Sequence, residues 1–435
     1  MKKFLFWWCL TASMACNKQQ PASPSPDPDP AIPLTIATIS PSDAASGPVT
    51  IKGTGFSVTL AENEVRFGVL AATVQSATAT QLEVALPPDM TPGAHDVTVK
   101  IKAQTVTKAK GFRLRGWVVS TFAGTGVWAS DDGPADKASF RQPTGIAVDA
   151  AGNFYVPDLH KIRKITPQGV VSTIAGGNGK GYIDDTGINA RFNTITSVVL
   201  DKANNLYVVD QMNFLIRKIT PAGVVSTVAG TVGVLGKKDG IGTHAAFSVP
   251  YGLAINAAGT HLYVGDQANH VIRKIALATS EVTTIAGSGE QTSKDGNGLQ
   301  AGVPSPGSMA FDADGMLYIT EKGGGKVRKM TLNGDITTIG GHLDVNSSPT
   351  HVVVDDEKNV YVTFSGMGKI KKYTPAGVES NFAGNNTGTG AEDGPAAVVF
   401  FQRPEGIALV KDPTGNPVFY IVDALRHKIK MIRKE

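Results

Sequence analysis

The sequence contains only two cysteines, Cys9 and Cys16, and both lie within its first 16 residues. The rest of the chain therefore has no disulfide, no thiol nucleophile and no thiolate metal ligand. The 41 basic and 37 acidic residues leave a net charge of only +4, and the basic residues are spread along the chain. A nucleic-acid-binding face needs basic residues concentrated on one surface, so nucleic acid is not an expected partner.

Common catalytic signatures are also missing. The sequence has no Gly-x-Ser-x-Gly elbow and no phosphate-binding loop. A catalytic zinc needs three convergent ligands, whereas His351 is the one histidine that we expect near the centre of the fold. Residues 311–315, Phe-Asp-Ala-Asp-Gly, match a fragment of a calcium loop but fall in an expected hairpin turn. We therefore predict no cofactor and no metal, and we favour a non-catalytic protein over an enzyme.

What the chain does contain is a repeat. A short segment of the type Ser/Thr-x-x-Ala/Gly-Gly recurs at intervals of roughly 43 to 57 residues, beginning at Ser120, Ser172, Ser226, Thr283, Thr337 and Ser380. Between the copies lie short runs rich in Val, Ile and Tyr, bounded by Gly, Asn or Asp, which is the pattern of short strands. A four-stranded unit of this size needs neighbours to bury both faces, and the spacing is that of propeller blades. The sequence predicts an all-β propeller.

Residues 250–287 show the repeat most clearly. They contain Pro-Tyr-Gly-Leu-Ala-Ile, then His-Leu-Tyr-Val-Gly-Asp, Asn-His-Val-Ile-Arg-Lys-Ile and Val-Thr-Thr-Ile-Ala-Gly. These segments resemble NHL repeats, and the resemblance extends from Trp117 to the C-terminus. It implies a six-bladed NHL-type β-propeller over residues 117–435.

The two ends of this region complement each other. The last unit has strand patterns at residues 406–410, 418–423 and 428–432, and then the chain ends without a fourth strand. Residues 117–124, in contrast, look like a fourth strand with no unit before it. Pairing the two would leave no unpaired strand edge in the ring. We predict that the N-terminal strand closes the propeller.

Residues 1–16 combine two lysines, an apolar run and small residues, as a secretory leader does. Residues 13–16, Ser-Met-Ala-Cys, resemble a bacterial lipobox, which implies that Cys16 is lipidated and anchors the exported protein to the outer membrane. The alternative is an ordinary leader with an incidental cysteine. Residues 17–33 are rich in proline and predict an extended spacer.

Residues 34–115 predict a separate β unit with short strands at residues 35–42, 48–57, 63–68, 78–87, 93–101 and 110–114. Its pattern of Ile-Ser-Pro-Ser, Gly-Thr-Gly-Phe and Pro-Gly-Ala-His-Asp-Val resembles the IPT/TIG domain. That resemblance implies an immunoglobulin-like β-sandwich. We expect it to act as a spacer rather than as a binding module.

The blades also carry repeated charges. Long connections between blades contain an Asp-Gly or similar pair followed by a phenylalanine, which we expect to anchor each connection because it repeats. The second strand ends in an acidic residue in five units, at Asp158, Asp210, Asp266, Glu321 and Asp423, and the third strand carries an arginine in four, at Arg163, Arg217, Arg273 and Arg328. We predict structural ion pairs between them. A charged ligand-binding ring is the alternative.

The fifth blade departs from this pattern. Its connection at residues 339–350 lacks the Asp-Gly and phenylalanine, its second strand lacks the acid, and His351 stands where other blades have glycine or serine. Long loops on a rigid scaffold commonly carry binding sites, and we call the face that bears them the loop face. The sequence predicts a pocket there, or simply a degenerate blade. The pocket residues would be His351, Thr350, Thr144, Ser197, Tyr251, Ser308 and Glu405.

Three functions remain open. The loop face could bind a glycan, for which Trp128, Tyr182 and Tyr251 are candidate stacking residues. It could instead dock a protein partner as a scaffold, through an apolar patch without a deep pocket. Some six-bladed propellers are metal-dependent lyases or hydrolases, which is the third alternative. Glycan binding by a non-catalytic surface protein is the interpretation that we favour.

Overall fold

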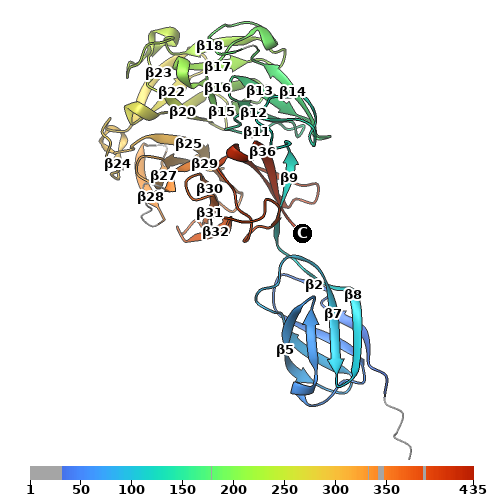
Figure 1. Ribbon diagram of the computed structural model, residues 1–435. Coiled ribbons are helices and arrows are strands. Elements are labelled where there is room, and N and C mark those ends of the chain that lie inside the picture. The colour runs from blue at the N-terminus through green and yellow to red at the C-terminus, as the bar shows by residue number, and fades with distance from the viewer. Residues whose placement is uncertain (1–31, 178, 332, 341–346, 386–387) are drawn as a thin grey trace, which may run out of the picture. The chain divides into compact units, whose positions relative to one another are not determined.

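The computed structural model describes residues 32–177, 179–331, 333–340, 347–385 and 388–435. The predicted leader, Cys16 and almost all of the proline-rich spacer lie outside these residues. The described residues form two compact units, one within residues 32–112 apart from residues 91–93, and one that contains residues 91–93 and 113–435 (Figure 1). Across the described ranges, no helix has the length and apolar character needed to cross a bilayer.

The smaller unit is a β-sandwich of eight strands. They are β1 Thr35–Ser40, β2 Asp43–Ala44, β3 Pro48–Thr54, β4 Glu64–Phe67, β5 Leu70–Ala77, β6 Gln81–Ala85, β7 Gly93–Ile101 and β8 Gln104–Leu114, with one short 3₁₀ helix, Leu60–Glu62. Every second residue of β4 and β6 is buried, because alternate side chains of a strand point to the same face. Phe67 and Phe112 meet edge to face in the core with ring centroids 5.2 Å apart.

One strand of this unit, β5, was not expected from the sequence. Its residues are Leu-Ala-Ala-Thr-Val-Gln-Ser-Ala, and none of them is fully buried. The strand is held by its pairing with β4 and β6 rather than by a strong apolar alternation. Its weak pattern explains why the sequence gives little sign of it.

The larger unit is the predicted six-bladed propeller (Figure 1). Blades one to three contain, from the innermost strand outward, β11 Ala147–Val148, β12 Phe154–Asp158, β13 Lys161–Ile165 and β14 Val170–Ala175; β15 Ile195–Leu200, β16 Leu206–Asp210, β17 Leu215–Ile219 and β18 Val225–Ala229; and β20 Pro250–Ile255, β21 His261–Asp266, β22 Val271–Ala276 and β23 Glu281–Ala286. Blades four to six contain β25 Pro306–Phe311, β26 Leu317–Glu321, β27 Lys326–Met330 and β28 Asp335–Ile339; β29 Pro349–Val354, β30 Val360–Phe364, β31 Lys369–Tyr373 and β32 Glu379–Ala383; and β34 Pro404–Lys411, β35 Pro417–Asp423, β36 Lys428–Lys434 and β9 Trp117–Ala123.

Shorter elements complete the blades. Two-residue strands extend four of the sheets: β10 Gly133–Pro134, β19 Gly240–Ile241, β24 Gly296–Asn297 and β33 Gly394–Pro395. Single turns of 3₁₀ helix occur at Gly187–Asn189, Gln211–Asn213, Gly242–His244, Gln267–Asn269, Gly298–Gln300 and Ala424–Arg426.

Hydrophobic side chains fill the space between neighbouring blades. Tyr155 and Ile162 of blade one, for example, share a buried cluster with Val198 and Val208 of blade two. A single blade has two apolar faces, and each face is removed from water only by the next blade. The innermost strands contact one another in ring order, so that blade three lies opposite blade six.

The ring is closed as the sequence predicts. β9 pairs antiparallel with β36, with Ser120 opposite Met431, in the same sheet as β34 and β35 (Figure 1). The main chains of Gly116 and Glu435 add two hydrogen bonds, of 3.0 and 2.9 Å, at the end of this pair. The outer edge of blade six is therefore made by residues that precede the whole propeller.

The repeated arginines confirm the predicted ion pairs, and the pairs lie within blades. The Arg163 side chain is fully buried, and its guanidinium contacts Asp158 at 3.0 Å and Asp132 at 2.8 Å. Asp132 also accepts a 3.0 Å hydrogen bond from the backbone of Thr173, so the Asp-Gly connection is anchored to the blade. The equivalent triplets are Arg217 with Asp210 and Asp184, Arg273 with Asp266 and Asp239, and Arg328 with Glu321 and Asp295.

Blades five and six modify this cluster. In blade five Phe364 replaces the acid, and Lys371 replaces the arginine and pairs with Glu379. In blade six Lys430 replaces the arginine and contacts Asp393 at 2.9 Å. The connection that distinguishes blade five includes residues 341–346, which lie outside the described residues, so the part of the predicted pocket that this connection would border is not described.

The calcium-like segment is a hairpin turn. Asp312 Oδ1 accepts hydrogen bonds from the backbone of Asp314 and Met316, at 3.0 and 2.9 Å, and Oδ2 accepts one from the Tyr318 hydroxyl. Asp149 makes the same type of turn in blade one. The repetition assigns this aspartate to turn formation.

Candidate functional site

A cavity of about 310 Å³ occupies the centre of the propeller. Its wall consists mainly of apolar residues from all six innermost strands, among them Val148, Leu200, Phe311 and Leu409. These strands are buried where they begin and become partly exposed toward their ends. The cavity therefore opens toward the face of the short hairpin turns, and its opposite end, where the strands begin, lies on the loop face. We call that end the channel mouth.

The channel mouth is bridged by a hydrogen bond between opposite blades. Tyr251, from blade three, donates its hydroxyl to Glu405 Oε2 of blade six at 2.9 Å. The other carboxylate oxygen, Oε1, accepts from Arg403 Nε at 2.8 Å. Both Tyr251 and Glu405 are buried, and burial together with the neighbouring carboxylate raises the pKa of Tyr251 well above its usual value. The bridge keeps the tyrosine protonated.

A lysine from blade four covers this bridge. Lys322 follows β26 directly, and its Nζ lies 4.1 Å from the centroid of the Tyr251 ring, within the range of a cation–π contact. In the described part of the chain Lys322 forms no salt bridge. Burial lowers the pKa of Lys322, the Glu405 carboxylate opposes that shift, and the Arg403 guanidinium adds to it.

His351 lies beside the bridge in blade five. Its ring centroid is 6.1 Å from that of Tyr251, and the residue is 6% exposed. Neither ring nitrogen has a hydrogen-bond partner among the described residues. Burial lowers the pKa of His351 to about 4, Lys322 adds to this shift, and the carboxylate of Glu405 opposes it. The Glu405 carbonyl also favours the charged ring, although it does not meet the geometry of a hydrogen bond. The effect of burial is larger than these opposing effects, so the imidazole is neutral at pH 7.

The structure thus brings together five side chains from four blades: Tyr251, Lys322, His351, Arg403 and Glu405. We call them the mouth cluster. Three of them were predicted from the sequence. Lys322 and Arg403 were not, because they lie just outside the innermost strands on which that prediction concentrated.

A signal for the two missed residues was present. At the position of Lys322 the other blades have Leu159, Gln211, Gln267, Ser365 and Ala424, and at the position of Arg403 they have Gln142, Thr194, Val249, Ser305 and Ser348. Each cation is therefore a single charged exception in an uncharged column of the repeat.

The other predicted site residues serve the packing of the innermost strands. The Thr144 hydroxyl donates to the Ile195 carbonyl at 3.0 Å, and Ser197 Oγ accepts from the Leu253 backbone at 3.2 Å. Thr350 Oγ1 lies 2.9 Å from Thr363 Oγ1 and contacts the Pro404 carbonyl. Each of these contacts joins adjacent strands or blades. Ser308, like Ser197 and His351, lines the cavity.

Two of the three aromatic candidates are exposed. Trp128 is 58% exposed, and the Arg141 guanidinium lies 4.2 Å from the centroid of its ring. Tyr182 is 60% exposed on the next connection between blades. Tyr251 is buried under Lys322, so the expectation of an exposed stacking ring at this position is wrong. Within the described ranges, no three His, Cys, Asp or Glu residues are grouped so that they could hold a metal ion.

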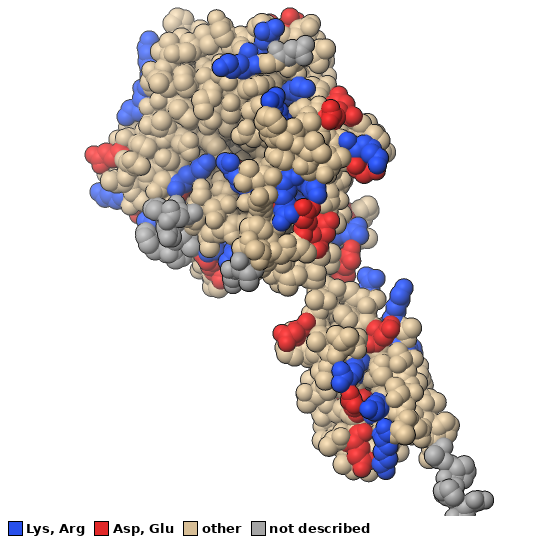
Figure 2. Space-filling model, in the orientation of Figure 1, with Lys and Arg blue, Asp and Glu red and all other residues tan. Residues whose placement is uncertain are grey.

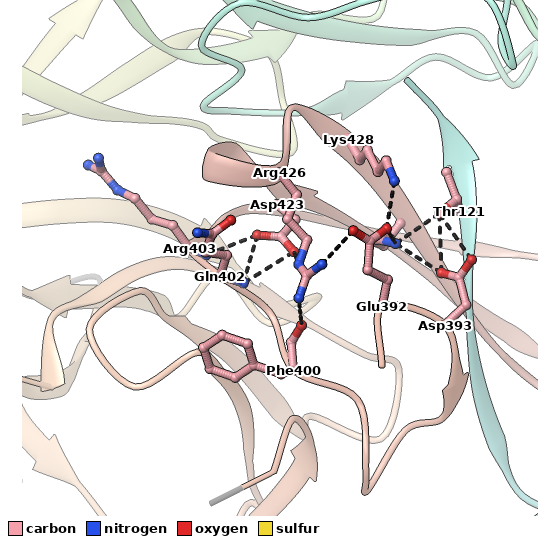
Figure 3. A network of polar contacts seen from close by, with 10 residues as sticks. Thr121, Glu392, Asp393, Phe400, Gln402, Arg403, Asp423, Arg426 and Lys428 are labelled. Carbon is pink, nitrogen blue, oxygen red and sulfur yellow. Dashed lines mark hydrogen bonds and ion pairs between the residues drawn. The ribbon is translucent and has the colours of Figure 1, made fainter. Parts of the chain in front are cut away.

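Charge is unevenly distributed over the propeller. On the face shown in Figure 2, Lys and Arg side chains lie both at the rim and close to the centre, whereas Asp and Glu side chains lie away from the centre. Figure 3 shows where the acids of blade six are used: Glu392 and Asp393 contact cations of β36 and its preceding turn.

Comparison with known proteins supports the predicted family of each of the two units. Residues 34–113 match the IPT/TIG domain family, and residues 127–200 match the teneurin NHL domain family. Mouse teneurin-3 is 27% identical over 268 residues, which cover 53% of this chain and 10% of teneurin-3. Bovine NHL repeat-containing protein 2 is 32% identical over 164 residues, which cover 34% of this chain and 23% of that protein. The matched region is thus less than a quarter of either relative.

Two solved structures share the fold over nearly the whole chain. An auxiliary nutrient binding protein from Bacteroides thetaiotaomicron has a TM-score of 0.60 at 17% identity and covers 93% of this chain and 98% of its own. A protein of unknown function from the same organism has a TM-score of 0.55 at 20% identity and covers 94% and 99%. Together with the repeats and the closed ring of blades, these matches show that the chain joins an N-terminal IPT/TIG domain to an NHL-type six-bladed β-propeller.

Proposed function

We propose that the protein is an exported, lipid-anchored binding protein whose propeller presents its loop face to a glycan. The IPT/TIG domain and the proline-rich segment would act as the spacer, and Cys16 would carry the lipid. The observation that carries this proposal is the mouth cluster, in which four blades converge on one polar site. Ligand sites commonly combine a few fixed polar groups with a largely preformed scaffold.

A glycan suits the surroundings of this site. Sugar rings have hydroxyl edges, which need hydrogen-bonding partners, and C–H faces, which stack on aromatic rings. The mouth cluster offers the first kind of contact, and the exposed Trp128 and Tyr182 offer the second on the connections of blades one and two. The fold likeness to a nutrient binding protein of Bacteroides thetaiotaomicron agrees with a binding role.

A glycan array tests this proposal. The protein lacking its leader, residues 17–435, should bind a restricted set of glycans, and Trp128→Ala should weaken that binding by about tenfold, since aromatic stacking contributes roughly 1 kcal/mol or more. Val69→Ala is the matched control, because Val69 is 84% exposed on the IPT/TIG domain. An empty array with folded protein would contradict glycan binding.

The lipid anchor needs a separate experiment. Growth with a labelled fatty acid should give a labelled membrane-bound protein, and Cys16→Ser should abolish both the label and the membrane association. Release of the unlabelled wild-type protein as a soluble species would contradict the anchor while leaving the binding site in place.

A second candidate function is docking of a protein partner. Its support is a set of exposed apolar residues on the connections of blades one and three: Val127, Trp128, Val234 and Leu235, which are 48–58% exposed. Exposed apolar side chains on one face can form a protein interface. Substitution of Leu235 by Asp should abolish such docking but leave glycan binding unchanged, and that contrast separates the two functions.

A further inference from the structure

The mouth cluster contains two cations and a single carboxylate. Lys322 and Arg403 are the cations, Glu405 is the carboxylate, and His351 is neutral at pH 7. The cluster thus has an excess of one positive charge in a partly buried setting. A positive charge removed from water is stabilised by an opposite charge, and the described residues supply none for Lys322 beyond the carboxylate that Arg403 and Tyr251 already share.

Glu405 cannot serve both cations. Its Oε1 accepts from Arg403 and its Oε2 accepts from the Tyr251 hydroxyl, so each oxygen is already used. Lys322 instead lies over the face of Tyr251, where it gains a weaker interaction than an ion pair would give. Its ammonium retains hydrogen-bond donors for a ligand.

Arg403 also retains donors. Only its Nε is used by Glu405, and the side chain is 46% exposed. Figure 3 shows the side chain extending away from the network of blade six, with its guanidinium free of contacts to the residues drawn there. The terminal nitrogens of a guanidinium present a planar pair of donors that matches a carboxylate or a sulfate.

The two cations are linked through a short chain of contacts. Lys322 covers the Tyr251 ring, Tyr251 donates to Glu405, and Glu405 accepts from Arg403. These contacts come from blades three, four and six, and they fix the positions of both cations before any ligand arrives. Such preorganisation lowers the entropic cost of binding.

We infer that the channel mouth binds an acidic glycan, and that Lys322 and Arg403 hold the anionic group of one of its sugars. This inference rests on the proposed glycan binding and narrows it to sugars that carry a carboxylate or a sulfate. The buried Tyr251 and Glu405 hold the two cations in place, and the exposed aromatic residues contact the rest of the glycan.

The experiment compares charged and neutral forms of one oligosaccharide by calorimetric titration. Trigalacturonate should bind to residues 17–435, and its methyl ester should bind about tenfold more weakly or not at all, because the ester loses a charge-assisted hydrogen bond. Lys322→Met and Arg403→Gln should each weaken trigalacturonate binding by a similar factor and should leave binding of the ester unchanged. Lys202→Met, at an exposed lysine of the short-turn face, is the matched control.

Each possible result either supports or contradicts the inference. Binding of a sulfated disaccharide but not of trigalacturonate would support the inference with sulfate as the anion, provided that Lys322→Met abolishes it. Equal affinity for trigalacturonate and its ester, or unchanged affinity in both variants, would overturn it. Binding of neutral glycans alone would overturn the inference but leave the proposed function intact, whereas no glycan binding at all would contradict the proposed function itself.

Discussion

Two kinds of buried polar cluster occur in this propeller, and they differ in whether each cation has an acidic partner of its own. In blades one to four, a buried arginine is held by two acids and by backbone carbonyls, with nearly the same partners each time. In the mouth cluster each residue occurs once, Lys322 lacks an acid, and His351 lacks a hydrogen-bond partner among the described residues.

This difference indicates that the repeated clusters stabilise the fold, whereas the mouth cluster serves binding. A group that recurs in four blades with its acidic partners present serves something that those blades share, which is packing and the anchoring of the connections. A group that breaks the repeat and has no partner of opposite charge, or no hydrogen-bond partner, among the described residues raises the energy of the empty protein. The second kind is what a binding site requires, because the ligand supplies the missing partner.

The largest expected effect concerns the first kind of cluster. Asp266→Ala removes the buried partner of Arg273 and leaves this buried charge only the half-exposed Asp239, so the free energy of unfolding should fall by about 3 kcal/mol. Urea unfolding followed by tryptophan fluorescence measures this, because the only tryptophans outside the predicted leader, Trp117 and Trp128, lie in the propeller. A loss below about 1 kcal/mol would show that these clusters do not stabilise the blades.

The next effect is the pH dependence due to His351. Its pKa falls from 6.5 to about 4 in the folded protein, so protons bind preferentially to the unfolded chain between these values. Stability should therefore be lost as the pH falls from 6.5 to about 4, by on the order of 3 kcal/mol. His351→Ser restores the type of residue found in blades two and four, and its stability should depend less on pH in this window. Identical pH profiles for the two proteins would contradict a buried neutral imidazole.

A smaller effect is expected at the closing blade. Glu392 contacts Arg426 and Lys428, which with Lys430 lower its pKa to about 2, led by the hydrogen bond from Lys428 (Figure 3). The wild type should be more stable than Glu392→Gln above pH 4.5, and the difference should vanish as the pH falls toward 2. Thermal unfolding at several pH values measures this difference. A gap that persists at pH 2 would mean that the charge of Glu392 is not its cause.

The smallest stability effect is expected at the mouth. Lys322→Met removes a charge that forms no salt bridge with any described residue, and it keeps an apolar chain over Tyr251. The free energy of unfolding should therefore change by less than about 1 kcal/mol or should rise. The same urea experiment used for Asp266→Ala gives the comparison. A loss as large as that of Asp266→Ala would make Lys322 a structural residue and remove the contrast between the two clusters.

Much of the fold follows from the sequence because the repeat is explicit. The six repeated segments that end in Ala-Gly or Gly-Gly, the arginines of the third strand and the unmatched strand at the start of the propeller predict both the blades and their closure. β5 of the IPT/TIG domain is less visible, since its Ala, Ser and Gln residues give no strong alternation. Pairing with neighbours, which a sequence does not display, determines that strand.

The site follows only in part. His351, Tyr251 and Glu405 are recognisable as exceptions within the innermost strands, and the structure places them together. Thr144 and Thr350 look equally available in the sequence, but their hydroxyls are used by carbonyls of the neighbouring blade. Lys322 lies in blade four and contacts Tyr251 of blade three. A contact between two blades depends on the assembled fold, so the sequence alone does not reveal it.

Hydrogen exchange with and without trigalacturonate tests the central claim most directly, because it reports the location of the ligand on the whole propeller. The account predicts slower exchange at residues 320–325 and 400–406, which carry Lys322 and Arg403, and no change in the short hairpin turns at residues 149–153 and 312–316. Protection confined to those hairpin turns, with no change at the channel mouth, would contradict it.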